Sequence, residues 1–111
     1  MKILTRHEEI VLLTILRLKD KAYLVTIKDM IKKYMDRDQS FGTLYVSLKR
    51  LKRYGYLSES VGAPTAKRGG KAVKYYRLTR DGITALKTIR KLHNAIWDDF
   101  SEIADEYTET L

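Results

Sequence analysis

Apolar residues recur at helical spacing in the first part of the chain and predict two helices there. Thr5 followed by Glu8 has the spacing of a capping box, so the first helix is expected to start at Thr5 and to run to about Lys19. Its apolar surface is wider than one core-facing stripe needs, which favours an additional contact with a second subunit. Thr26 is expected to cap a second, shorter helix. The apolar side of that helix consists of Ile27, Met30, Ile31 and Tyr34.

A third helix and a hairpin follow. Ser40 is the expected N-cap of the third helix, and Gly55 stands where a C-terminal glycine ends a helix. One side of this helix is lined by Leu44, Leu48 and Leu51. Residues 56–61 and 73–78 are short runs rich in aromatic and branched side chains, which predicts two strands. The glycine-containing segment between them predicts a long, exposed hairpin tip.

The last part of the chain has the most regular apolar pattern. Thr79 is the expected cap of a long final helix. Its seam positions alternate at spacings of three and four residues and are Leu86, Ile89, His93, Ile96, Phe100, Ile103 and Tyr107. This heptad pattern is typical of a helix that pairs with another helix. Because so small a domain cannot bury the whole seam, we expect a homodimer that pairs through this helix.

The order helix, helix, helix, hairpin, helix predicts a mainly α (α+β) fold. This fold is a winged helix-turn-helix with three helices and a two-stranded wing, and the 111 residues suffice for one domain. We expect residues 1–80 to form the winged helix-turn-helix DNA-binding domain. Residues 81–111 are expected to form a C-terminal dimerisation helix that is continuous with it. The third helix of this arrangement places its N-terminal half in the major groove of DNA.

The distribution of charge indicates an anionic partner. The formal net charge is +8, and ten Lys or Arg residues but a single acid, Glu59, occur between Leu44 and Arg80. After Lys91 the chain carries six acids and neither Lys nor Arg. Double-stranded DNA is therefore the expected partner of the basic middle, and the acidic end is expected to point away from it.

The third helix and the hairpin tip supply the expected DNA contacts. The hydroxyl groups of Thr43 and Ser47 and the methyl groups of Val46 suit base edges. Lys49 and Arg53 suit phosphates, which fix the register without reading sequence. Cations at the hairpin tip are expected to enter or border a minor groove. The full expected set is Ser40, Thr43, Tyr45, Val46, Ser47, Lys49, Arg50, Arg53, Lys67, Arg68 and Lys71.

Residues for catalysis or metal binding are few. With no cysteine and two histidines, His7 and His93, the sequence shows neither a metal-ligand cluster nor a nucleophile with its base. We therefore expect no enzyme activity, no metal and no cofactor. The absence of cysteine suits a reducing compartment, and the longest apolar stretch is far shorter than a membrane span. A cytoplasmic protein without membrane contact is the expectation.

The third helix, the hairpin and the residues after it resemble the PadR family of bacterial winged-helix transcriptional regulators. Residues 42–57 follow the pattern GxLYxxLxRLxxxGxL, and residues 75–82 follow YYxLTxxG. The wing glycines Gly69 and Gly70 complete a match that spans most of the chain. The resemblance implies a homodimeric, usually repressing regulator whose C-terminal helix supplies the dimer contact. It also implies that a small phenolic or multidrug-like ligand often modulates activity.

Two points stay open at this level. Trp97 stands beside the seam positions Ile96 and Phe100, where a flat indole either contacts a planar aromatic effector or packs in the dimer interface. The basic third helix favours DNA as the partner, and with the resemblance this gives a sequence-specific repressor that binds a pseudo-palindromic operator as a homodimer. Release by a small aromatic ligand is what the resemblance implies. The alternative is a winged-helix module that binds proteins and not DNA.

Overall fold

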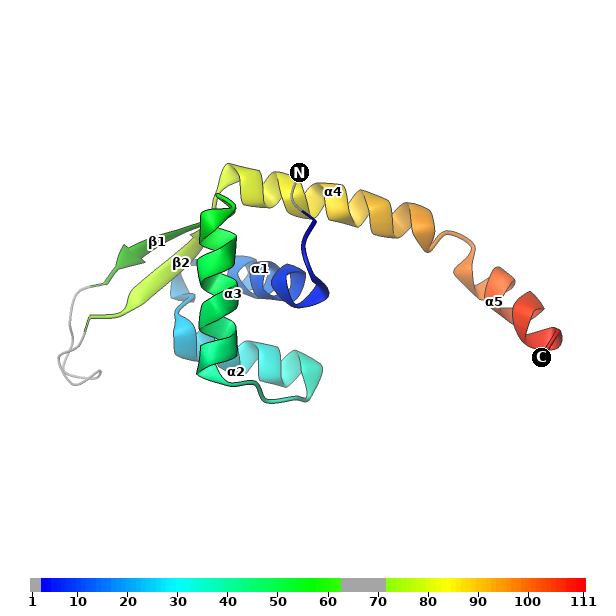
Figure 1. Ribbon diagram of the computed structural model, residues 1–111, viewed down its shortest axis with the longest axis horizontal. Helices are drawn as coiled ribbons and strands as arrows, with labels where there is room; N and C mark the ends of the chain where they lie inside the picture. Colours follow the sequence, from blue (N-terminus) through cyan, green and yellow to red (C-terminus); the bar gives the residue numbers. More distant parts are fainter. Residues whose placement is uncertain (1–2, 63–71) are drawn as a thin grey trace.

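The computed structural model describes residues 3–62 and 72–111 of the chain. Along the chain these residues form α1 (Arg6–Leu18), η1 (Lys19–Lys21), α2 (Leu24–Met35), α3 (Phe41–Arg53), β1 (Leu57–Val61), β2 (Lys74–Leu78), α4 (Arg80–Ile96) and α5 (Phe100–Glu109). The predicted winged helix-turn-helix is confirmed, with α2 and α3 as the helix pair and the antiparallel strands β1 and β2 as the wing (Figure 1).

One hydrophobic core holds the first three helices, the wing and the start of α4 together. Figure 1 shows α3 between the wing on one side and the beginning of α1 on the other. The apolar positions that recur at helical spacing face inward, where their removal from water drives folding. The buried apolar residues are Val11, Leu12, Ile15, Ala22, Ile27, Ile31, Leu44, Leu48, Leu51, Tyr56, Leu57, Tyr76, Ala85 and Leu86.

Three of the predicted helix caps are confirmed. Thr5 Oγ1 accepts the backbone N–H of Glu8 at 3.1 Å, and Glu8 Oε1 accepts the N–H of Thr5 at 2.9 Å, which completes the capping box at α1. Ser40 caps α3, and Thr79 caps α4 by accepting the N–H of Gly82 at 3.1 Å. Each cap satisfies a backbone donor that has no partner inside its helix.

The predicted cap of α2 is wrong. The helix begins at Leu24, and Thr26 is its third residue. The Thr26 Oγ1 accepts the backbone N–H of Tyr23 at 3.0 Å and donates to the Lys21 carbonyl at 2.6 Å. A hydroxyl at the third helical position thus accepts a backbone N–H at the N-terminus of the helix, as a hydroxyl at the N-cap also does. The sequence alone therefore does not show which of the two positions Thr26 occupies.

Hydrogen bonds connect the turn that ends α3 to Thr79, the cap of α4. Gly55 has a φ of 81°, and its N–H donates to the Lys52 carbonyl at 3.0 Å, while the N–H of Tyr56 donates to the Leu51 carbonyl at 3.0 Å. This is a Schellman ending, as the predicted C-terminal glycine requires. Thr79 then donates its hydroxyl to the Gly55 carbonyl at 2.5 Å and its N–H to the Tyr56 carbonyl at 3.0 Å.

The wing places two neighbouring tyrosines on opposite faces of its sheet. Tyr76 pairs with Glu59 across the strands and is buried. Tyr75 lies on the other face, where its ring packs edge-on against Tyr23 with centroids 5.5 Å apart. This alternation is the ordinary geometry of a strand. The predicted wing-tip contacts Lys67, Arg68 and Lys71 lie outside the described residues.

The C-terminal segment forms two helices, so the prediction of one continuous helix is wrong. α4 ends at Ile96 and α5 begins at Phe100, and Asp99 between them has a left-handed φ of 56°. Asp98 and Asp99 lie at the negative end of the α4 dipole but at the positive end of α5. Aspartate also adopts the left-handed conformation more readily than most residues. Local electrostatics therefore favour a break where the apolar pattern continues.

The predicted dimer seam is divided between the core and the surface. Leu86 is 9% exposed and belongs to the core of its own subunit, so its assignment to a dimer interface is wrong. The reason is that the first turns of α4 pack against α1. Ile89 and His93 are half-buried, and His93 Nδ1 lies 3.8 Å from Glu9 Oε1 of α1. The exposed apolar side chains farther along are Leu92, Ile96, Trp97, Phe100, Ile103 and Tyr107.

Candidate nucleic-acid interface

The exposed side of α3 combines cations with apolar and small residues. The buried residues of this helix are Leu44, Ser47, Leu48 and Leu51. Because successive residues are rotated by roughly 100°, the side opposite them carries Gly42, Val46, Lys49 and Arg53. All of these are exposed, as is Tyr45 beside them. Lys49 Nζ lies 5.7 Å from the centre of the Tyr45 ring, a favourable contact between a cation and an aromatic face.

Ser47 does not lie on this side, so its prediction as a base contact is wrong. The residue is 6% exposed, and its Oγ shares a hydrogen bond of 2.9 Å with His7 Nδ1 of α1. The other ring nitrogen of His7 is hydrogen-bonded to Gln39 Oε1 at 2.5 Å, in the turn before α3. Ser47 stands three residues after Leu44 and four before Leu51, and this spacing is the sequence signal that indicates burial.

Arg50 lies at the edge of α3 that faces α1. Its Nη1 is 3.7 Å from Oε2 of Glu8, a carboxylate whose side chain is 2% exposed. A buried carboxylate is costly without a compensating charge, and Arg50 supplies it. The arginine side chain remains 45% exposed. Arg50 therefore has a structural task and still presents part of its surface to a partner.

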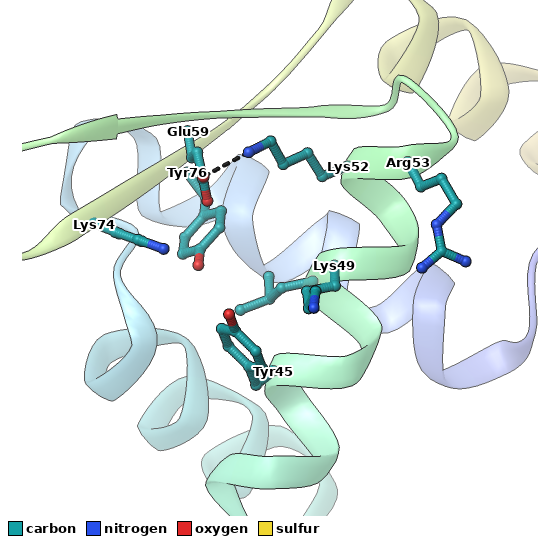
Figure 2. A pocket seen from close by; sticks show the side chains of 8 residues that line it. Tyr45, Lys49, Lys52, Arg53, Glu59, Lys74 and Tyr76 are labelled. Atoms are coloured by element: carbon teal, nitrogen blue, oxygen red, sulfur yellow. Dashed lines mark hydrogen bonds and ion pairs between the residues drawn. The ribbon is translucent and has the colours of Figure 1, made fainter.

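A groove of about 370 Å³ lies between α3 and the wing, at the other edge of the helix (Figure 2). It is lined by Tyr45, Leu48, Lys49, Lys52, Arg53, Glu59, Lys74 and Tyr76. Figure 2 shows Lys52 reaching from α3 to β1, where its Nζ lies 2.5 Å from Glu59 Oε1. The groove thus brings together four cations and one acid from three elements, and this excess of positive charge attracts anionic groups.

Two titratable groups in the groove have shifted pKa values. The hydrogen bond from Lys52 lowers the pKa of Glu59, and the charge of Lys74 acts in the same direction. Glu59 is therefore ionised at neutral pH and cancels part of the positive charge around it. Burial raises the pKa of Tyr76, and the neighbouring Glu59 carboxylate raises it further. The Tyr76 hydroxyl consequently stays protonated and remains a hydrogen-bond donor.

The first turn of α3 uses its hydroxyl groups for capping. Ser40 Oγ accepts the N–H of Thr43 at 3.0 Å and lies 2.9 Å from Thr43 Oγ1. Both residues are exposed. From α2, Lys28 Nζ donates to Oδ1 of Asp38 in the preceding turn at 2.7 Å and lies 5.0 Å from the centre of the Phe41 ring. These contacts fix the approach of the chain to α3.

The model of the transcriptional regulator PadR-like family matches residues 12–88. These residues include the second half of α1, the helix-turn-helix, the wing and the first half of α4. The chain belongs to the PadR-like family. As a member of a family of transcriptional regulators, it is a DNA-binding regulator, and the family is not one of enzymes. No curated protein sequence matches the chain.

Solved structures of PadR proteins share its fold. A PadR-like transcription factor from Bacteroides fragilis is 28% identical, with 91% of this chain and 88% of that chain covered and a TM-score of 0.65. A PadR family regulator from Eggerthella lenta is 22% identical over 89% of this chain and 84% of that chain, with a TM-score of 0.69. One from Clostridium difficile is 23% identical over 92% and 98%, with a TM-score of 0.61.

Lys74 and Glu59 belong to the groove of this PadR-like protein, although neither was among the site residues that the sequence indicates. Lys74 and Tyr76 are two residues apart on β2, so they lie on the same face of the wing. Glu59 pairs with Tyr76 and therefore shares that face. The signal was available as strand alternation, but using it requires knowing that this face turns toward α3.

Trp97 lies at the end of α4 in this PadR-like chain. It is exposed, and its ring contacts Phe100 with centroids 4.8 Å apart.

No described helix is long and apolar enough to cross a bilayer. Within residues 3–62 and 72–111, His, Asp and Glu side chains form no group of three that would hold a metal ion.

Proposed function

We propose that this PadR-like protein recognises a specific DNA sequence and represses transcription from it. The groove between α3 and the wing carries the proposal, because Lys49, Lys52, Arg53 and Lys74 gather there around a single carboxylate. Phosphate groups dominate the affinity of proteins for DNA, and such a cluster attracts them. The exposed side of α3 beside the groove supplies the contacts for the major groove.

The contacts divide by chemistry. We assign Lys49, Arg53 and Lys74 to phosphates, where they hold the duplex without reading it. Thr43, Tyr45 and Val46 are assigned to base edges, because they lie in the half of α3 that enters a major groove. The remaining proposed contacts are Ser40 and Arg50 at the margins of α3, Lys52 in the groove, and Lys67, Arg68 and Lys71 at the wing tip.

We propose that two copies pair through α4 and α5. The seam residues Ile96, Phe100 and Ile103 are exposed in a single chain, and a second copy would remove them from water. Twofold pairing presents two α3 helices to a pseudo-palindromic operator, with half-sites separated by about one helical turn of DNA.

We also propose that a small aromatic ligand releases the protein from DNA. Trp97 and Phe100 form an exposed aromatic pair beside the proposed seam. In a dimer, two such pairs offer flat apolar faces on which a planar ligand stacks. The ligand would act by favouring a dimer geometry in which the two α3 helices no longer match the operator.

Duplex binding measured against salt concentration tests the DNA proposal. We expect the logarithm of the association constant to fall with the logarithm of salt by about 0.9 for each phosphate contact, and one site to be preferred by at least about 10³-fold over random duplex. Lys49→Ala and Arg53→Ala should each lower that slope by about one on every sequence. Thr43→Ala should change the preferred site instead. A protein that binds no duplex at low salt would be a protein-interaction module.

A further inference from the structure

Gly42 is a glycine that the fold does not require. It is the second residue of α3 and is exposed. Its φ is not in the left-handed range, since Gly55 is the sole described glycine with a positive φ. A Cβ added at Gly42 would meet one atom within 4 Å, the Ser40 Oγ at 3.8 Å, which is an ordinary contact. An alanine therefore fits there without strain.

The other described glycines each have a structural reason. Gly55 has the left-handed φ that ends α3. A Cβ at Gly82 would collide with the Tyr56 carbonyl oxygen, and one at Gly62 would collide with the Tyr75 ring. Glycine inside a helix lowers stability relative to alanine because the unfolded chain gains more freedom. Gly42 therefore lowers the stability of α3, although neither its φ nor its packing requires a glycine.

The position of Gly42 suggests what the missing side chain permits. Tyr45 and Val46 follow three and four residues later, and Lys49 follows seven residues later, so all lie on the same side of α3. An α-helix with side chains has a diameter of about 10–12 Å, and the major groove of DNA is about 12 Å wide. A helix end that lacks a side chain on its leading side enters such a groove more deeply.

We propose that Gly42 is the point at which DNA comes closest to the backbone of α3. This rests on the proposed function, and it names the contact that sets the depth of the helix in the major groove. A methyl group at this position would push the end of α3 outward. Tyr45 and Val46 would then lose their base contacts, although no charge and no phosphate contact is removed.

A size series at position 42 tests the proposal. Gly42→Ala and Gly42→Leu should raise the dissociation constant for the duplex that the wild type selects from a random pool, by about 10-fold or more for Ala and further for Leu. The salt slope should stay unchanged because no cation is altered. The melting temperature of both variants should be equal to or above that of the wild type. Thr84→Ala, an exposed substitution on α4, is the matched control and should leave affinity unchanged.

Three outcomes would overturn the inference. Equal affinity of Gly42→Ala and the wild type would show that the DNA does not approach the backbone there. A lower melting temperature of Gly42→Ala would show that the glycine serves the fold. A wild type that selects no duplex from the pool would reject the proposed function itself, whereas in the first two outcomes the wild type still binds and the proposed function stands.

Discussion

Thr43 and Ser47 lie one turn apart on α3, yet their hydroxyl groups have different surroundings. Thr43 is exposed and shares a hydrogen bond with Ser40. Ser47 is buried and shares one with His7, which is 40 residues away in the sequence. Similar side chains on one helix therefore have separate roles, one available to a partner and one internal.

Replacing Ser47 by alanine should affect stability and not DNA preference. The change leaves a ring nitrogen of His7 without its partner in a half-buried position, which costs about 1–3 kcal/mol. Urea unfolding measures the loss, and selection from random duplex should return the wild-type site. Thr43→Ala is the matched variant, with a stability change below about 0.5 kcal/mol and an altered site. The reverse pattern would place Ser47 in the interface.

We expect Glu59 to limit the affinity of the groove for DNA. Glu59→Gln removes the negative charge and frees Lys52, so binding should tighten on all sequences and the salt slope should steepen by about 0.9, the value of one phosphate contact. Glu102→Gln in α5 removes the same charge away from the groove and serves as control. Equal effects of the two variants would mean that only net charge matters.

The contribution of the Glu59 carboxylate to the stability of the protein should depend on pH. The folded protein holds the pKa of Glu59 below its usual value of 4.5, mainly through the hydrogen bond from Lys52. The ion pair therefore stabilises the protein above that usual value, and this stabilisation is lost as pH falls through the lowered pKa. The stabilities of wild type and Glu59→Gln should differ most above pH 4.5 and converge as pH falls through the lowered pKa of Glu59, which acid unfolding measures.

Sequence distance decides which of these side-chain partners could be foreseen. The Thr5 and Glu8 pair is three residues apart, so its geometry follows from the helix alone. The Lys52 and Glu59 pair spans the end of a helix and the start of a strand. The position of Glu59 relative to α3 depends on how the wing folds back, which no local pattern specifies.

Among the elements, α3 could be predicted at both ends and the C-terminal segment could not. Ser40 and Gly55 act on the backbone next to them, so their roles are legible in the sequence. At Asp99 the apolar seam predicts continuation, while two adjacent aspartates favour an end. The apolar pattern indicates which residues are buried and contains no information about this charge effect. It therefore does not predict the break between α4 and α5.

Gly55→Ala should destabilise the protein through backbone strain alone. No atom lies within 4 Å of an added Cβ, but the φ of 81° is left-handed and costs an L-residue about 1–2 kcal/mol. Denaturant unfolding should show a loss of that size. Gly55→Asn should lose less, because asparagine tolerates this conformation better. An alanine variant of wild-type stability would mean that α3 ends differently.

The whole molecule is longer than a chain of this length needs to be. Its radius of gyration is 17.4 Å and its longest dimension is 62 Å, whereas a compact domain of 111 residues has a radius of gyration of roughly 13 Å. Figure 1 shows the reason, since the second half of α4 and all of α5 extend away from the core. The proposed second copy would cover this exposed apolar arm.

Charged residues in the arm should separate the subunits. Ile96 and Phe100 are 71% and 53% exposed, so a single chain tolerates Ile96→Glu with Phe100→Glu, but a dimer interface does not. Sedimentation should show monomers that bind the full operator at least about 10-fold more weakly, because each keeps one α3. Ser101→Glu, off the seam, should remain dimeric. A double variant that sediments as a dimer would exclude pairing at these residues.

The peptide between Gly55 and Tyr56 links the orientation of α4 to that of α3. Its carbonyl is held by Thr79, the residue from which α4 starts, while the amides on both sides of it close the last turn of α3. These hydrogen bonds fix the start of α4 relative to the end of α3. In the proposed twofold pair, a change in the angle between the two α4 helices would therefore also move the two α3 helices and change the distance between the half-sites that they fit.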